Sequence, residues 1–214
     1  MIGDDFAAVL TAAQQGDEAA FARLWHDGQP ALLRYLHVIA PDGAEDIASE
    51  TWTQVVRGLT RFRGNEQNWR AWLFTTARRR VIDQTRQLMR RPTTSLETLP
   101  DLALADLAGL RSPDAAELAL ENLATRAAME VIGRLPPLQA EVIMLRVVAG
   151  LDTEAVGQLL GRSTGAIRIA AHRGLHRLAS LLAEAADERS GSAERDQHGL
   201  PESERRVRAR GVTR

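Results

Sequence analysis

The stretch Leu151–Leu182, LDTEAVGQLLGRSTGAIRIAAHRGLHRLASLL, predicts two helices joined by a tight turn. The first helix, Thr153–Leu160, is short, and Gly161 can end it because glycine adopts left-handed backbone angles without a steric cost. Ser163 is a suitable N-cap for the second helix. The apolar residues of this second helix recur at steps of three and four, so they share one face: Ile167, Ala171, Leu175, Leu178 and Leu182.

The other faces of the second helix carry basic side chains, which are Arg168, His172, Arg173, His176 and Arg177. Gly157 falls where the two helices of such a hairpin must approach closely. A short helix, a glycine turn and a longer basic helix are typical of a helix-turn-helix, whose second helix enters the major groove of DNA. For this stretch taken alone, an ordinary helical hairpin is the alternative.

The composition indicates a globular protein without disulfides. The 214 residues suit one large domain or two small ones. The chain has no cysteine, which excludes disulfides, thiolate metal sites and cysteine nucleophiles and is compatible with a reducing cytoplasm. No apolar run approaches the roughly 20 residues that span a membrane. The first residues, MIGDDFAAVL, do not resemble a signal peptide. We therefore expect a cytoplasmic protein.

Charges of opposite sign are segregated along the chain. Residues 61–91 contain nine arginines and two acidic residues, whereas residues 92–130 contain seven acidic residues and two arginines. Residues 131–184 are basic again, with six arginines and four acidic residues. Two basic blocks separated by an acidic one suggest two nucleic-acid contacts on one chain.

Periodicity predicts only helices in the N-terminal part of the chain. We expect a short helix over Asp4–Gln15 and a longer one capped by Asp17, which Pro30 kinks or splits. A third helix is expected over Ala44–Leu59, and a polar loop over 61–68 precedes a long arginine-rich helix, Trp69–Arg90. Four helices of this size can bury a core.

The fold class predicted for the whole chain is all-α, with two small helical domains joined by a flexible linker. The first domain covers residues 1–91, and an acidic linker with two prolines covers 92–111. The second domain, 112–186, contains the helix-turn-helix. The segment 187–214 is rich in charge, serine and glycine, so we expect a disordered, solvated tail.

Four stretches taken together resemble one family. They are AEDIASETWTQVV (44–56), FRGNEQNWRAWLFTTARRRVID (62–83), LPPLQAEVIMLRVVAGLD (135–152) and the terminal helix-turn-helix. In this order and at this spacing they resemble the bacterial extracytoplasmic-function (group IV, sigma-70 family) RNA polymerase sigma factors. The resemblance covers residues 6–183. It implies a sigma region 2 domain at 1–91 and a sigma region 4 domain at 112–186.

The resemblance implies that the helix at 44–56 docks on the clamp of the largest polymerase subunit. The matching exposed positions are Asp46, Glu50 and Thr53. In isolation such a helix would be interpreted as a solvated polar face. Ser49 departs from the family, which often has glutamine at that position.

The resemblance also implies that the first domain recognises and melts the minus-ten promoter element and captures a flipped base in the loop before its last helix. Reading an unpaired base requires amides for its edge and a flat wall for stacking. Phe62 or Trp69 could provide the wall, although Trp69 could equally belong to the core, and Trp72 is assigned to the core. The candidate minus-ten residues are Arg63, Asn65, Gln67, Asn68, Trp69, Arg70, Arg78, Arg79, Arg80 and Arg86.

The second domain is implied to read the minus-thirty-five element as duplex. The candidate contacts are Arg162, Ser163, Thr164, Arg168, His172 and Arg173. Ser163 and Thr164 lie at a helix N-terminus, where free N–H groups favour a phosphate. The arginines can pair bidentately with guanine. Ile169 and Ala170 depart from the polar residues common in the family, so either fewer side chains read bases or an apolar contact with a thymine methyl replaces one. His172 and His176 could instead be surface histidines.

The function implied is that of a non-enzymatic subunit that binds core RNA polymerase, directs it to promoters and helps melt the minus-ten region. Its partners would be the clamp of the largest subunit, the flap of the second-largest subunit, promoter DNA and, in many family members, an anti-sigma factor. The linker would run through the RNA-exit path, or else be a solvated spacer. No cofactor, metal or membrane is expected. An autonomous helix-turn-helix regulator would not explain residues 62–69, and no carboxylate cluster or nucleophile supports an enzyme.

Overall fold

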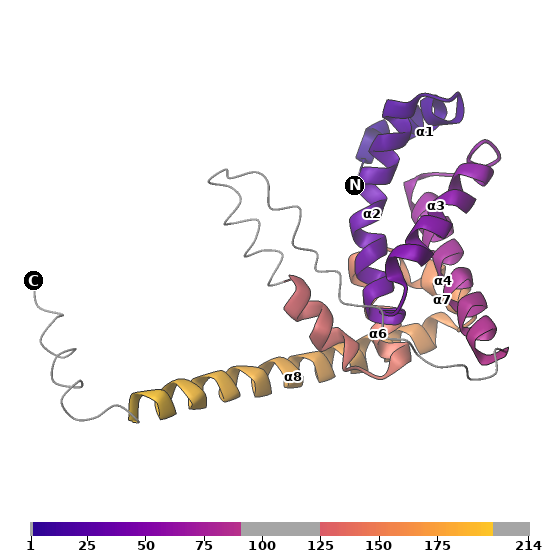
Figure 1. The fold of residues 1–214 in the computed structure, drawn as a ribbon. Coiled ribbons are helices and arrows are strands. Elements are labelled where there is room, and N and C mark those ends of the chain that lie inside the picture. The colour runs from indigo at the N-terminus through magenta and orange to yellow at the C-terminus, as the bar shows by residue number, and fades with distance from the viewer. Residues whose placement is uncertain (1, 91–124, 199–214) are drawn as a thin grey trace, which may run out of the picture. The chain divides into compact units, whose positions relative to one another are not determined.

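The computed structural model describes residues 2–90 and 125–198, and all of its regular elements there are helical. Figure 1 shows them in chain order. The predicted linker, 92–111, lies outside the described residues, as do 112–124 and 199–214. Residues 1–174 form one compact unit, and the chain from Leu175 onward forms a second, which is described separately. None of the described helices is long and apolar enough to cross a membrane.

The N-terminal helices follow the predicted pattern closely. After a short 3-10 turn, η1 (Gly3–Asp5), the helices are α1 (Phe6–Gln14), α2 (Glu18–Ile39), α3 (Ala44–Leu59) and α4 (Glu66–Arg90). Asp17 caps α2 because its carboxylate accepts a hydrogen bond from the backbone N–H of Ala20 at 2.9 Å. Pro30 does not split α2, which is continuous through it.

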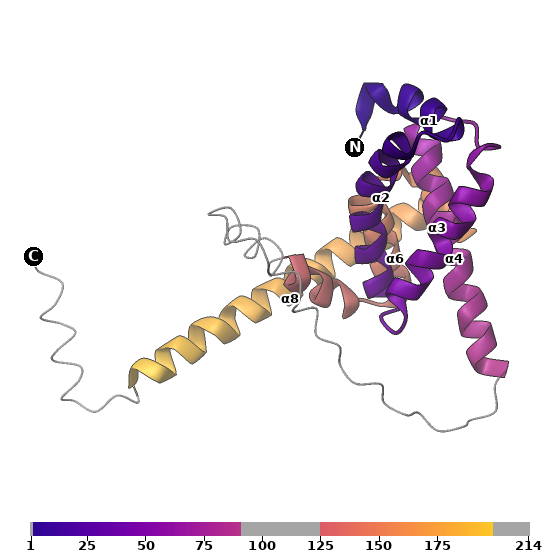
Figure 2. The ribbon, with the colours of Figure 1, turned by 45° about the horizontal axis from the view of Figure 1, so that its top comes forward.

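Helices α2, α3 and α4 pack side by side, and α1 packs on α2 (Figure 2). Their fully buried apolar side chains lie at helical spacing, as an amphipathic helix requires: Leu24, Leu32, Leu36, Ile47, Val55, Leu73 and Phe74. Thr51 is buried among them, and its hydroxyl donates to the carbonyl of Ile47 at 2.7 Å. The polar group is therefore satisfied inside the core.

The C-terminal helices begin with a helical segment at 125–133. They continue with α6 (Pro137–Ile143), a π-helical stretch η2 (Met144–Val148), α7 (Thr153–Leu160) and α8 (Thr164–His198). Their core contains the fully buried side chains Val142, Met144, Leu145, Leu151, Val156 and Ile167.

The helix-turn-helix forms through the local signals expected of it. Gly161 ends α7 at φ +64°, and the hydroxyl of Ser163 accepts from the N–H of Ala166 at 3.2 Å. A Cβ on Gly157 would lie 2.8 Å from the carbonyl oxygen of Arg162, which confirms the predicted close approach.

Three predictions need correction. Helix α4 begins at Glu66 and not at Trp69, so the loop before it is shorter than expected. Leu175 and Leu182, placed by periodicity on the face of Ile167, are exposed, because both come after Gly174, the last residue of the first compact unit. The chain after residue 187 is not disordered throughout, since α8 continues to His198.

Candidate nucleic-acid interface

A cluster of aromatic rings holds the loop between α3 and α4. Trp69 is 1% exposed. The centroid of its ring lies within about 7 Å of the centroids of four other aromatic rings: Phe62 at 5.6 Å, Trp72 at 5.5 Å, Trp52 at 6.5 Å and Phe6 at 6.4 Å. The sequence leaves Trp69 open between core and stacking wall, and the structure places it in the core. It is therefore not accessible as a wall for a base.

A different flat surface lies beside it. Phe62 and Trp72 stack with ring centroids 5.1 Å apart and an interplanar angle of 19°, and both are partly exposed. Trp72, which the sequence assigns to the core, is thus only partly buried, with its ring against Gly58, where a Cβ would lie 2.8 Å away. This stacked pair is an aromatic surface that periodicity does not reveal, because its accessibility depends on how α3 and α4 cross.

The amides where the loop meets α4 have a structural role as well as an exposed position: Asn65 ends the loop, and Gln67 and Asn68 lie in the first turn of α4. The Oδ1 of Asn68 accepts from the N–H of Asn65 at 3.1 Å, and the Oδ1 of Asn65 accepts from the N–H of Asn68 at 2.9 Å. This reciprocal pair is a capping box at the start of α4. The acceptor oxygens of both amides are therefore engaged, while Gln67 between them is exposed.

Other contacts fix the loop from outside. The side-chain amide of Gln14, at the end of α1, donates to the carbonyls of Leu59 and Phe62 at 2.8 and 2.9 Å, which ties α1 to the end of α3 and to the loop after it. Glu66 accepts from the backbone N–H groups of Ile2 and Gly3, both at 3.0 Å. Neither contact is visible in a pattern search, because each joins residues 45 or more positions apart.

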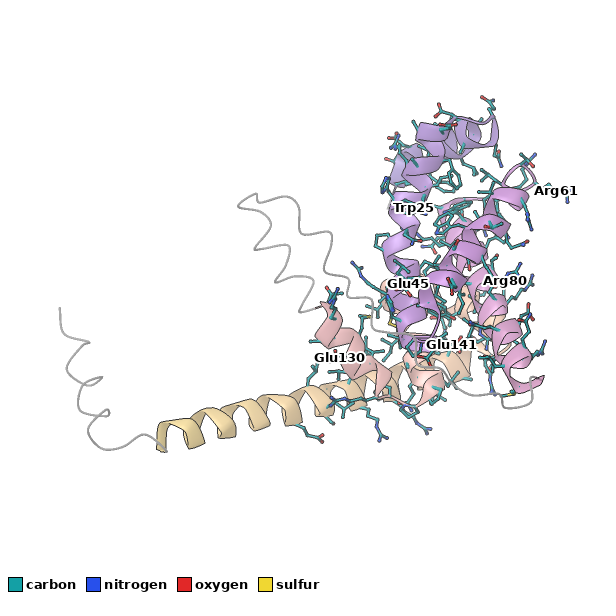
Figure 3. The ribbon with its side chains drawn as sticks, viewed as in Figure 1. Trp25, Glu45, Arg61, Arg80, Glu130 and Glu141 are labelled. Atoms are coloured by element: carbon teal, nitrogen blue, oxygen red, sulfur yellow. The ribbon has the colours of Figure 1, made fainter. Side chains whose placement is uncertain are left out.

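The arginines predicted to hold DNA fall into two groups. Arg63, Arg79 and Arg86 are exposed, as is Arg61, labelled in Figure 3 at the loop. Arg80 lies 3.9 Å from Glu50 on α3, and Arg78 pairs with Glu141 at 2.8 Å. Arg70 points inward: its side chain is 11% exposed and contacts Asp27 at 2.9 Å and Glu66 at 3.5 Å.

The start of α8 presents all six predicted minus-thirty-five residues to solvent: Arg162, Ser163, Thr164, Arg168, His172 and Arg173. The two unusual positions beside them behave differently. Ala170 is 7% exposed and packs inward, whereas Ile169 is 54% exposed. Ala170 is therefore a core residue, and Ile169 is an apolar side chain on the exposed face of the helix.

On α3, the side chains of Asp46, Glu50 and Thr53 are exposed and share one face at steps of four and three. Beside this face runs a groove of about 580 Å³ between α2 and α3. Trp25 and Glu45, both labelled in Figure 3, line it together with Ser49, Trp52 and Thr53. An open groove with aromatic walls next to exposed acidic residues is suited to a protein partner.

The pKa of Tyr35 is displaced from its ordinary value. Burial raises the pKa of its phenol well above the ordinary value of 10, and the neighbouring Glu141 carboxylate raises the pKa further. Among the described residues, no group of three or more His, Cys, Asp or Glu side chains is placed to hold a metal ion.

Comparison with known proteins identifies the family. The Sigma-70 region 2 family matches residues 24–91, and the Sigma-70 region 4 family matches residues 125–178. The ECF RNA polymerase sigma factor SigD of Mycobacterium tuberculosis is 32% identical over 193 residues, covering 87% of this chain and 88% of SigD. This chain belongs to the ECF RNA polymerase sigma factors. The resemblance stated from the sequence is thereby confirmed.

Another relative of this sigma factor is the ECF RNA polymerase sigma factor ShbA of Streptomyces griseus, 33% identical over 188 residues, with 81% of this chain and 93% of ShbA covered. The fold is similar to that of CnrH in complex with the cytosolic domain of CnrY (TM-score 0.54, 23% identity, 85% of this chain and 99% of CnrH). It is also similar to the sigma factor RpoE of Bartonella quintana in complex with the anti-sigma factor NepR (TM-score 0.52, 23% identity, 76% and 96%). As a sigma factor, the protein directs RNA polymerase to specific promoters for transcription initiation.

Proposed function

We propose that three surfaces of this sigma factor make separate contacts during transcription initiation. The exposed face of α3, with Asp46, Glu50 and Thr53, docks on the clamp of the largest polymerase subunit. The loop before α4 and the first turn of α4, which carries Gln67, capture a nontemplate base of the minus-ten element. The first turns of α8 read the minus-thirty-five duplex, while their domain contacts the flap of the second-largest subunit.

The observation that carries the minus-ten assignment is the rigid presentation of Gln67. The capping box of Asn65 and Asn68 and the buried ring of Trp69 fix the backbone on both sides of it, while its own side chain is exposed. A side chain that recognises a base must be positioned before the base binds, because ordering that side chain on binding costs free energy. The stacked rings of Phe62 and Trp72 provide the flat surface that an unstacked base needs.

On α8 we propose that Arg168 and Arg173 contact bases or phosphates and that Ile169 contacts a thymine methyl group. An apolar side chain exposed among basic ones is suited to this contact, since the C5-methyl of thymine is the apolar group in the major groove. Ser163 and Thr164 at the helix N-terminus would hold a phosphate.

We further propose that the protein has no catalytic activity of its own and acts in the cytoplasm. One related structure contains the anti-sigma factor NepR, and another contains the cytosolic domain of CnrY. We therefore propose an anti-sigma factor as a further partner. The groove between α2 and α3 offers aromatic side chains to such a partner or to polymerase.

The test uses reconstituted holoenzyme on promoters that carry one abasic site at each nontemplate minus-ten position in turn. The wild-type protein should lose open-complex stability at one position, where the captured base is missing. Gln67→Ala should show a uniform, lower stability without that single-site loss. A Gln67→Ala profile identical to the wild-type profile would overturn the loop assignment, and a Thr60→Ala variant, exposed on the same connection, serves as control.

A further inference from the structure

The N-terminal elements η1 and α1 lie beside the segment to which base capture is assigned. The Sigma-70 region 2 match begins at residue 24, so η1 and α1 precede it and have no part in the functions described above. Figure 2 shows α1 near the same end of the helices as the connection between α3 and α4, residues 60–65. Although α1 packs on α2, its polar contacts reach this connection.

Gln14, at the end of α1, holds the beginning of the connection. Its Nε2 donates to the carbonyl of Leu59, the last residue of α3, at 2.8 Å and to the carbonyl of Phe62 at 2.9 Å. Phe62 is one ring of the stacked pair with Trp72 that is proposed as the surface for the captured base. Gln14 therefore fixes the backbone from which that ring projects.

Arg63 also contacts this backbone, but its contact competes with DNA. Its guanidinium donates to the carbonyl of Phe62 at 2.7 Å. Arg63 is exposed and is a candidate contact for the minus-ten strand, so its guanidinium can exchange this carbonyl for a phosphate, which is a stronger, charged acceptor. Gln14 is partly buried and uncharged. The bond from Gln14 is therefore the one that can still hold Phe62 after the strand has bound.

Glu66 holds the other end of the connection, in the first turn of α4. Its carboxylate accepts from the backbone N–H groups of Ile2 and Gly3, each at 3.0 Å, and lies 3.5 Å from the guanidinium of Arg70. These groups compensate an acidic charge that would otherwise repel a nearby DNA strand. Since Glu66 directly precedes Gln67, they also fix the turn from which Gln67 projects.

An aromatic contact joins the two ends. Phe6 of α1 is 4% exposed, and its ring centroid lies 6.4 Å from that of Trp69, which in turn lies 5.6 Å from that of Phe62. Between these fixed points the connection contains Gly64 at φ +151°, a residue with high conformational freedom. The connection therefore depends on contacts from outside for its order.

We propose that η1 and α1 hold this connection in its base-binding conformation, with Gln14 and Glu66 as positioning residues for Phe62 and Gln67. The inference rests on the proposed function of Gln67 and of the Phe62–Trp72 pair. A segment that is already ordered loses less conformational entropy when a base binds, so the open complex is more stable. Gln14 and Glu66 act through the captured base, and their effect requires that this base is present.

The test is a cycle that combines a protein substitution with the removal of one base. Open-complex lifetimes of reconstituted holoenzyme are measured on an intact promoter and on templates with one abasic site at each nontemplate minus-ten position. Gln14→Met keeps a side chain of similar length but cannot donate. It should shorten the lifetime on the intact promoter roughly three- to tenfold, about the net contribution of one hydrogen bond.

The position dependence carries the inference. On the template without the captured base, Gln14→Met should have no effect, whereas on templates with an abasic site elsewhere the loss should persist. Gln15→Met, at the neighbouring exposed position, is the matched control and should leave every lifetime unchanged.

Glu66→Gln tests the second contact. It keeps the size of the side chain but replaces one acceptor oxygen with an NH2 group that faces a backbone N–H. We expect the same position-dependent loss, with unchanged affinity for core polymerase because the docking face of α3 takes no part in these contacts. Glu18→Gln, an exposed acidic residue in the first turn of α2, is the matched control.

Urea unfolding of the free proteins separates positioning from stability. A lowered midpoint together with an equal loss of lifetime on every template would show that Gln14 and Glu66 only stabilise the fold, and it would overturn the inference. Wild-type lifetimes in both variants would overturn it as well. Failure of the proposed function would be recognised separately, as identical abasic-site profiles of the wild type and Gln67→Ala.

Discussion

Gly157→Ala tests whether the helix-turn-helix depends on a close backbone approach. The added Cβ would lie 2.8 Å from the carbonyl oxygen of Arg162, and that atom belongs to the turn itself and not to a flexible side chain. Overpacking of this kind costs about 1–3 kcal/mol, and a backbone obstacle favours the upper part, about 2–3 kcal/mol. Alanine's greater helix propensity offsets about 1 kcal/mol. We expect a net loss of about 1–2 kcal/mol in the free energy of unfolding.

The assay is urea unfolding followed by circular dichroism, with a thermal scan in parallel. A loss of this size lowers the melting temperature by about 2–4 °C per kcal/mol for a unit of this length. Two variants are matched controls. At Gly161 there is space for a Cβ, but the backbone φ is +64°, which a residue with a side chain rarely adopts. Gly161→Ala should therefore lower the free energy of unfolding by roughly 1–2 kcal/mol through backbone strain alone. Gly133→Ala has free space in a helical segment and should be neutral or stabilising by up to about 1 kcal/mol.

Gly157→Ala should also change the affinity of the protein for duplex DNA. Displacement of the turn moves the first residues of α8, so Gly157→Ala should also weaken binding of holoenzyme to the minus-thirty-five element. A Gly157→Ala protein as stable as Gly133→Ala, with unchanged upstream affinity, refutes the reasoning. It would mean that the turn moves away from the methyl group without cost.

Three further predictions use other features of the structure. Deoxyuridine in place of one upstream thymine should weaken wild-type binding by about 1 kcal/mol and leave Ile169→Ala unaffected, whereas equal losses in both proteins would exclude the methyl contact. Asn65→Ser, which retains a capping oxygen, should preserve stability, while Asn65→Ala should lose about 1 kcal/mol; equal urea midpoints would argue against the capping box. Tyr35 is the only tyrosine in a chain without lysine or cysteine, and burial raises its pKa in the folded state, so its stabilising contribution is complete below about pH 10 and is lost above that. Urea unfolding from pH 8 to 11 should therefore show a decline that is absent in Tyr35→Phe, and parallel curves would contradict it.

Features set by neighbours in the chain could be predicted from the sequence. Asp17 caps α2, Ser163 caps α8 and Gly161 ends α7 as expected, because each acts on backbone groups within four residues of itself. The bounds of α3 were also predictable, since its buried stripe repeats at helical spacing over four turns. The family motifs are likewise local runs of residues, and they were sufficient to indicate a sigma factor.

Site residues were harder to predict where local and distant contacts compete. Asn65 and Asn68 were expected to read bases, and the capping box shows that their oxygens first serve the helix. Trp69 and Trp72 have the same side chain three residues apart, yet one is buried and the other is partly exposed. The helix period places them on neighbouring positions, and only the crossing of α3 over α4 separates their environments.

The helices, their caps, the turn of the helix-turn-helix and the family can all be predicted from the sequence, because each depends on residues a few positions apart. Which of the candidate residues are accessible depends instead on how the helices pack. Tyr35 and Glu141 are 106 positions apart, and Arg78 and Glu141 are 63 apart, so no periodicity could pair them. The stretch from Leu151 to Leu182 shows both kinds of information. Its glycine turn follows from local backbone chemistry, while the burial of Ala170 and the exposure of Ile169 follow from what packs against α8.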